Sequence, residues 1–121
     1  MAMRRFGPLE AAVMNQMWAS NGPVSVRDVL ARLDRQLAYT TVQTVMDALH
    51  RKGWLHRHRD GRANLYAAAA TREDYVSALL SEALDQAADR PAALLRLVET
   101  LDTSDAERLR QALRTASGAR R

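Results

Sequence analysis

The segment AYTTVQTVMDALHRKGWL, residues 38–55, constrains the fold most strongly. Its apolar residues recur at i, i+3, i+4 and i+7, the spacing of one helix face, and these residues are Val42, Val45, Met46 and Leu49. The stretch is also rich in β-branched residues, which helices mildly disfavour. Because Thr40 and Gln43 have the spacing of a capping box, the sequence predicts a helix from about Thr40 to Lys52, ended by a left-handed Gly53.

Start and stop signals divide the rest of the chain. Pro8 begins a helix ending near residue 20, and Ser25 with Asp28 caps a short helix over residues 26–33. The dipeptide Asp60-Gly61, flanked by extended segments, predicts a β-hairpin with a type I′ turn. Three more helices are expected over residues 71–88, 91–101 and 104–117, the first capped by Thr71 and Asp74 and the last by Ser104 and Glu107.

Two helices joined by a turn and followed by a basic hairpin are the parts of a winged helix-turn-helix domain. We therefore predict a mainly α fold in which residues 1–67 form this DNA-binding domain and residues 68–121 form a helical dimerisation region with its last few residues disordered. The chain has no cysteine, and its longest apolar run, LYAAAA, is too short to span a membrane. We expect a cytoplasmic protein without disulfides.

Charge is distributed unevenly along the chain. Residues 1–66 carry ten Lys and Arg against five Asp and Glu, whereas residues 67–121 carry eight against nine. A basic first half is typical of a nucleic-acid-binding surface, and a neutral second half indicates a different partner.

The second helix of such a unit lies in the major groove, with its N-terminal residues nearest the base edges. Threonine offers a hydroxyl to a base or phosphate and a methyl group to thymine, and glutamine can pair with adenine. We expect Thr41, Gln43 and Thr44 to read bases, with Thr40 and Arg51 near the DNA backbone. The alternative is that Thr40 and Gln43 only cap the helix and the other threonines are solvated.

Arginines dominate the predicted hairpin. A turn at Asp60-Gly61 would put Arg59 and Arg62 side by side, where like charges destabilise a hairpin. DNA phosphates would neutralise these charges, and counterion release would supply affinity. We expect Arg57, Arg59 and Arg62 to contact phosphates, the alternative being a merely solvated charge run.

Three histidines, His50, His56 and His58, raise the question of a metal site. No thiolate or carboxylate stands at ligand spacing beside them, and no serine lies in a G-x-S-x-G context. We predict no metal site, no cofactor and no enzymatic activity.

Leucine-rich stripes mark the second half of the chain. Three short helices cannot cover so much apolar surface by themselves, so a partner is expected, most simply a second copy. A two-fold dimer would present two recognition helices to a palindromic operator. The alternative is that the segment packs on the winged domain. The residues expected at the dimer interface are Tyr75, Leu79, Leu80, Leu84, Leu94, Leu95, Val98 and Leu101.

Over nearly its whole length the sequence resembles the penicillinase-repressor family of bacterial winged-helix regulators, the BlaI/MecI/CopY group. The segments that carry the resemblance are LEAAVMNQMW, VSVRDVLARL, AYTTVQTVMDALHRKGWL and RANLYAA. The resemblance implies a homodimer that binds palindromic operators through residues 40–52 and represses resistance or stress genes.

The chain departs from the family pattern at three places. Asp47-Ala48 stands where many relatives have a basic residue, which implies a different operator sequence. Staphylococcal-type members are released by cleavage at an Asn-Phe bond, but the only phenylalanine here is Phe6, and the cysteine motif of the copper-responsive branch is absent. The inducing signal and any upstream sensor or protease stay undetermined. The alternative function is a winged-helix module that binds another protein.

Overall fold

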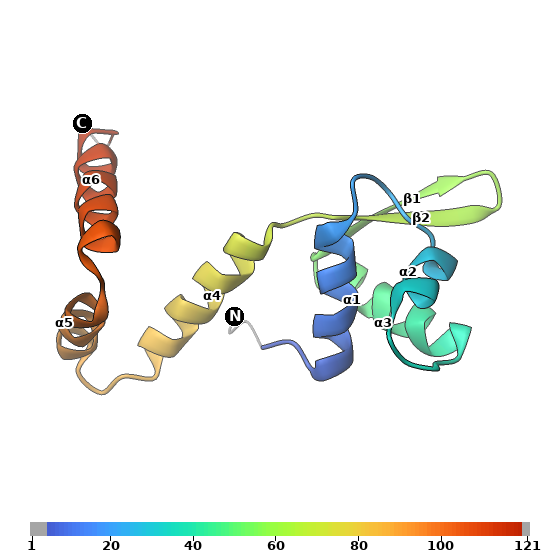
Figure 1. Ribbon diagram of the computed structural model, residues 1–121, viewed down its shortest axis with the longest axis horizontal. Helices are drawn as coiled ribbons and strands as arrows, with labels where there is room; N and C mark the ends of the chain where they lie inside the picture. Colours follow the sequence, from blue (N-terminus) through green and yellow to red (C-terminus); the bar gives the residue numbers. More distant parts are fainter. Residues whose placement is uncertain (1–4, 120–121) are drawn as a thin grey trace. The chain divides into compact units, whose positions relative to one another are not determined.

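A computed structural model describes residues 5–119 (Figure 1). The elements follow one another as α1 (Pro8–Ala19), α2 (Val26–Arg32), α3 (Tyr39–Arg51), β1 (Leu55–Asp60), β2 (Ala63–Ala68), α4 (Arg72–Asp85), α5 (Arg90–Thr100) and α6 (Thr103–Ala119). This order confirms the predicted mainly α fold with three helices, a β-hairpin and a helical C-terminal region. No helix in the described part of the chain has the length and apolar character needed to cross a bilayer.

The chain divides into two compact units between Leu79 and Leu80, inside α4. The N-terminal unit contains α1 to α3, the hairpin and the first turns of α4, and the C-terminal unit contains the end of α4 with α5 and α6. The domain boundary predicted from the sequence, between residues 67 and 68, precedes this division by about three turns of helix.

The core of the N-terminal unit lies between its three helices and the base of the hairpin. Each helix buries the face that the apolar spacing predicted, and β1 and β2 close the core with Leu55 and Tyr66. Val45 is half-buried and packs against this core. The buried side chains are Val13, Met14, Met17, Val24, Val26, Val29, Leu33, Val42, Met46, Leu49, Trp54, Leu55 and Tyr66.

Two of the predicted capping boxes are present. The Ser25 hydroxyl accepts a hydrogen bond from the Asp28 amide at 3.1 Å, and the Asp28 carboxylate accepts one from the Ser25 amide at 3.0 Å. Thr71 and Asp74 make the same pair of bonds at the start of α4, at 3.0 and 2.9 Å. At the other end of a helix, Gly53 has a φ of 90° and follows α3 as predicted.

The other two capping boxes are wrong. α3 begins after Ala38, with no side chain as its cap, so Thr40 lies inside the first turn. α6 begins at Thr103, because the Asp102 carboxylate accepts a hydrogen bond from the Asp105 amide at 2.7 Å. α6 also includes residues 117–119, which the sequence assigned to a frayed tail, and Arg120 and Arg121 lie outside the described residues.

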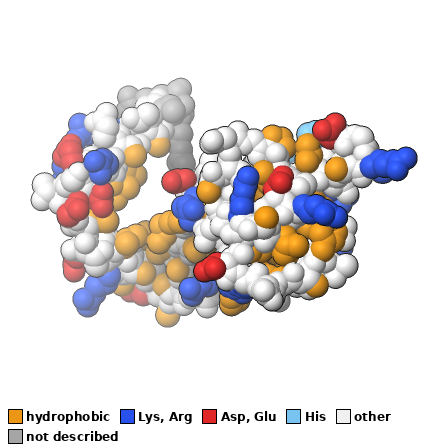
Figure 2. Space-filling model, turned by 45° about the vertical axis from the view of Figure 1, so that its right-hand side comes forward, with side chains coloured by type: hydrophobic (Ala, Val, Ile, Leu, Met, Phe, Trp, Pro, Cys, Tyr) orange, Lys and Arg blue, Asp and Glu red, His pale blue; other side chains and the backbone are white. Residues whose placement is uncertain are grey.

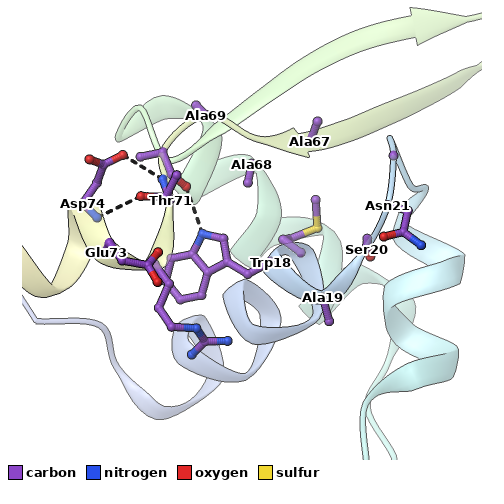
Figure 3. A pocket seen from close by; sticks show the side chains of 14 residues that line it. Trp18, Ala19, Ser20, Asn21, Ala67, Ala68, Ala69, Thr71, Glu73 and Asp74 are labelled. Atoms are coloured by element: carbon purple, nitrogen blue, oxygen red, sulfur yellow. Dashed lines mark hydrogen bonds between the residues drawn. The ribbon is translucent and has the colours of Figure 1, made fainter.

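The junction between β2 and α4 is fixed to α1 by Trp18. Its indole N–H donates a hydrogen bond to the Ala70 carbonyl at 2.9 Å, and the Arg72 guanidinium lies 4.8 Å from the centre of its ring. Figure 3 shows this indole beside the Thr71–Asp74 capping box. A surface pocket of about 610 Å³ lies here, between the end of α1 and the start of α4.

Candidate nucleic-acid interface

Helix α3 turns an apolar face inward and a hydroxyl-bearing face outward. Val42, Met46 and Leu49 are fully buried in the core. On the outer side Thr40, Thr41, Thr44 and Arg51 are exposed, while Gln43 is half-buried. The core therefore fixes the rotation of α3 about its own axis and leaves the predicted base-reading residues on its accessible side.

The threonine hydroxyls of α3 are not used to cap the helix. Since Ala38 is the N-cap, the alternative in which Thr40 and Gln43 serve only as a capping box is wrong. Thr44 donates its hydroxyl hydrogen to the Thr40 carbonyl at 2.8 Å. Thr44 thus offers an outside group an acceptor oxygen and a methyl, while the Thr40 hydroxyl keeps its donor.

The end of α3 is tied down by its C-terminal turn. The Trp54 amide donates to the Leu49 carbonyl at 2.9 Å and the Gly53 amide to the His50 carbonyl at 3.0 Å, which are the two bonds of a Schellman motif. Lys52 forms an ion pair with Glu10 of α1, with 2.7 Å between the charged atoms. Although partial burial raises the pKa of Glu10, the hydrogen bonds from Lys52 and the Gly7 amide outweigh it and lower that pKa.

The hairpin turn lies one residue later than predicted. Asp60 pairs with Ala63, so the turn is Gly61-Arg62, and only Gly61 has a positive φ, of 62°. A type II′ turn requires positive φ at its first central position alone, so Asp60 stays extended in β1. The predicted type I′ turn at Asp60-Gly61 is therefore wrong, and so is the cross-strand pairing of Arg59 with Arg62, because Arg59 pairs with Asn64.

Two arginines still mark the tip of the hairpin. Arg62 occupies the turn, and Arg59 donates a hydrogen bond from Nε to the Gly61 carbonyl at 3.2 Å. Both are exposed, and neither forms an ion pair within residues 5–119. Figure 2 shows Lys and Arg side chains standing out from the N-terminal unit, on the right of that view.

Arg57 has a different environment from the two arginines at the tip. Its guanidinium lies 3.1 Å from Oδ1 of Asp47 on α3. The same oxygen accepts a hydrogen bond from the Tyr66 hydroxyl at 2.7 Å. Burial, and then the bond to Asp47, raise the pKa of Tyr66, so its phenol is a donor at neutral pH. Neither Asp47 nor Tyr66 was among the predicted site residues, since sequence spacing gives no sign that strands β1 and β2 meet α3 here.

Tyr66 also anchors the hairpin to the loop before α2. Its amide donates to the Val24 carbonyl at 2.8 Å and its carbonyl accepts from the Val24 amide at 2.9 Å. The hairpin is thus held at its base to two helices while its tip extends beyond them (Figure 1).

The histidines do not meet at one place. His50 donates from Nδ1 to the Leu55 carbonyl at 3.0 Å, whereas His56 and His58 are exposed on β1. Within residues 5–119 no group of three or more His, Asp and Glu side chains is placed to hold a metal ion.

The residues predicted for a dimer interface fall into three groups. Leu80, Leu94, Leu95 and Val98 are exposed, and Leu79, Leu84 and Leu101 are half-buried. Tyr75 instead packs inside its own unit among aromatic rings. Sequence reasoning missed further exposed apolar side chains on the C-terminal helices (Figure 2), namely Val76, Leu97, Leu109 and Leu113.

Three helices, an exposed third helix and an arginine-tipped hairpin define a winged helix-turn-helix protein. Within that class the chain belongs to the penicillinase repressor family, whose sequence profile matches residues 6–115. It is 42% identical over 116 residues to the transcriptional regulator BlaI of Mycobacterium tuberculosis, covering 92% of this chain and 84% of that protein. The family resemblance seen in the sequence is confirmed, and transcriptional regulation is a non-enzymatic role.

Solved structures show the same fold. The monomeric form of Bacillus licheniformis BlaI, in complex with the blaP half-operator, is 26% identical with a TM-score of 0.50, covering 60% of this chain and 89% of that one. A variant of Staphylococcus aureus MepR bound to an oligodeoxyribonucleotide is 17% identical with a TM-score of 0.52, covering 96% of this chain and 80% of that one.

Proposed function

We propose that this protein is a homodimeric transcriptional repressor that binds a palindromic operator with α3 in the major groove. The observation that carries the proposal is the exposed threonine face of α3 beside the arginine-tipped hairpin. The DNA complexes of B. licheniformis BlaI and S. aureus MepR support it. Occlusion of a promoter by the bound dimer would be sufficient for repression.

Each side chain has a role in this proposal. Thr41, Gln43 and Thr44 read base edges, because they lie on the side of α3 away from the core and near its N-terminus. Thr40 and Arg51 contact the sugar-phosphate backbone on either side.

The hairpin supplies contacts that do not depend on base sequence. Arg59 and Arg62 are exposed at its tip and each can release about one counterion on meeting a phosphate. This contact and the groove contact together require the hairpin and α3 to reach the same stretch of duplex.

The dimer forms through the apolar surface of the C-terminal helices. That surface includes Leu94, Leu95 and Val98 on α5 and Leu109 and Leu113 on α6. Water leaves these side chains when a second copy covers them. We leave Tyr75 out of this interface, because its ring is engaged within its own unit.

The proposed genes are those of antibiotic resistance or stress response, on the strength of the family. Transcript levels in a strain lacking the protein should rise for the genes next to its operator. Transcript levels that do not change there would contradict repression.

Selection of bound sequences from random duplex DNA tests the function. Recovery of a palindrome with half-sites a whole number of helical turns apart is the expected result. A protein-interaction module would recover no sequence and would bind duplex DNA weakly at any salt concentration.

A salt titration with one matched pair of variants separates wing contacts from general charge. Arg62→Gln should flatten the dependence of log affinity on log salt by about 0.9, the contribution of one phosphate contact. Arg90→Gln, which removes the same charge from the C-terminal unit, should leave the slope unchanged. Equal slopes for the two variants would exclude Arg62 from the interface.

A further inference from the structure

The Asp47 carboxylate joins the recognition helix to both strands of the hairpin. Its Oδ1 lies 3.1 Å from the Arg57 guanidinium of β1 and 2.7 Å from the Tyr66 hydroxyl of β2. Arg57 and Tyr66 are cross-strand partners, so they present their side chains on the same face of the hairpin. This face is the one turned toward α3.

Asp47 lies within the face of α3 that the proposed function directs at DNA. Thr40, Thr44, Asp47 and Arg51 are spaced i, i+4, i+7 and i+11, which places them along one side of a helix. A carboxylate in this stripe repels phosphates on any duplex. Its ion pair also neutralises Arg57, a residue that the sequence assigned to phosphate contact.

Stability does not account for this arrangement. The Arg57 and Asp47 side chains are 38% and 37% exposed, and an ion pair at that exposure contributes little to folding. Tyr66 is 1% exposed, and a buried phenol needs a hydrogen-bond acceptor, which a neutral side chain at position 47 could also supply. The negative charge therefore needs another explanation.

We propose that Asp47 is a positioning residue that determines specificity: it holds the hairpin against α3 and occupies Arg57, so that two wing arginines rather than three are available to random DNA. This inference rests on the proposed DNA binding. Withholding one phosphate contact weakens the sequence-independent part of binding and leaves the base contacts of α3 intact. The ratio of operator affinity to random-duplex affinity rises as a result.

Asp47→Asn tests the charge, because asparagine keeps the size and the acceptor oxygen of aspartate. On random duplex its plot of log affinity against log salt should be steeper than that of the wild type by about 0.9. This equals an additional loss of affinity of about three- to fourfold between 50 and 200 mM salt. Arg57→Gln alone should leave the wild-type slope unchanged, and the double variant should return to it.

Asp60→Asn is the matched control, because it removes one carboxylate from the hairpin without releasing an arginine from an ion pair of the described structure. It should keep the wild-type slope. Three results would overturn the proposal: no change of slope in Asp47→Asn, a slope lowered by Arg57→Gln alone, or the same increase in the double variant.

Failure of the proposed function gives a different pattern. If the wild type ignores duplex DNA at low salt, the function and the charge role of Asp47 both fail. The positioning role is then decided by amide hydrogen exchange: hairpin amides should exchange faster in Asp47→Ala than in Asp60→Ala. Equal rates in the two variants would overturn the positioning role as well.

Discussion

Phe6 and Tyr75, 69 positions apart in the sequence, stack with their ring centres 4.1 Å apart and their planes 7° from parallel. The Phe6 amide donates a hydrogen bond to the Tyr75 hydroxyl at 2.8 Å. The Trp54 ring meets both edge-on, at 5.1 and 5.4 Å. The segment before α1, the residue after α3 and the first turn of α4 therefore share one aromatic cluster.

Removing the Tyr75 ring should loosen the start of α4. Tyr75→Ala is expected to lower the free energy of unfolding by about 2–4 kcal/mol, because it deletes a large packed side chain. Tyr75→Phe should cost about 1 kcal/mol, the value of one hydrogen bond. Urea denaturation at a fixed protein concentration measures both effects.

The control for Tyr75 is Ser77→Ala, an exposed position on the same helix, which should change stability by less than about 0.5 kcal/mol. A Tyr75→Ala protein as stable as this control would show that α4 does not depend on the aromatic cluster.

A charge on the apolar surface of α5 should prevent dimer formation. Leu95 is 61% exposed, and burying a leucine contributes about 1.5–3 kcal/mol, so Leu95→Glu should weaken self-association by at least about tenfold. Sedimentation analysis measures this change, with Gln111→Glu on α6 as the control for added charge. An unchanged dimer in Leu95→Glu would place the interface elsewhere.

The hairpin turn should depend on the single glycine with positive φ at its tip. Gly61→Ala is expected to destabilise the protein by about 1 kcal/mol, because an L-residue is strained at a φ of 62°. Gly22→Ala provides the contrast, since Gly22 has no positive φ and open space where its Cβ would lie. Thermal unfolding should show a lower midpoint for the first variant only, and equal midpoints would contradict the turn geometry.

The capping box of α2 should make stability depend on acidic pH. The hydrogen bond from the Ser25 amide, followed by that from the Ser25 hydroxyl, lowers the pKa of Asp28 below its unfolded value. A group with a lowered folded pKa stabilises above its unfolded pKa, and this contribution is lost as pH falls through the folded pKa. Stability should therefore decline below about pH 4, and less steeply in Asp28→Ala.

Asp34→Ala is the control for this pH profile, because Asp34 is exposed and has no ion pair within residues 5–119. It should keep the wild-type slope between about pH 5 and pH 3. A wild-type profile that is flat across this range would contradict the capping role of Asp28.

The helices were predictable from the sequence because local patterns determine them. The apolar spacing of Val42, Met46 and Leu49 is sufficient to orient α3, and Gly53 marks its end. Helix starts were less certain where two hydroxyl or carboxyl residues compete for one cap. The spacing of Thr40 with Gln43 matched a capping box, yet Thr40 lies within the first turn and accepts from Thr44 instead.

The environment of the wing was not predictable from spacing alone. The turn shifted by one residue because the backbone of Gly61, and not that of Asp60, takes positive φ. The pairing of Arg57 with Asp47 depends on how the hairpin meets α3, a tertiary contact that no periodicity encodes. The arginines expected to behave alike therefore have different surroundings.

Tyr66 has a consequence for protein engineering. Its backbone pairs with Val24, its ring fills the core, and its hydroxyl bonds to Asp47. A chimera that takes the hairpin from a relative has to transplant positions 47, 57 and 66 as one module. Exchange of the hairpin without its helix partner would leave a grafted loop with no mooring.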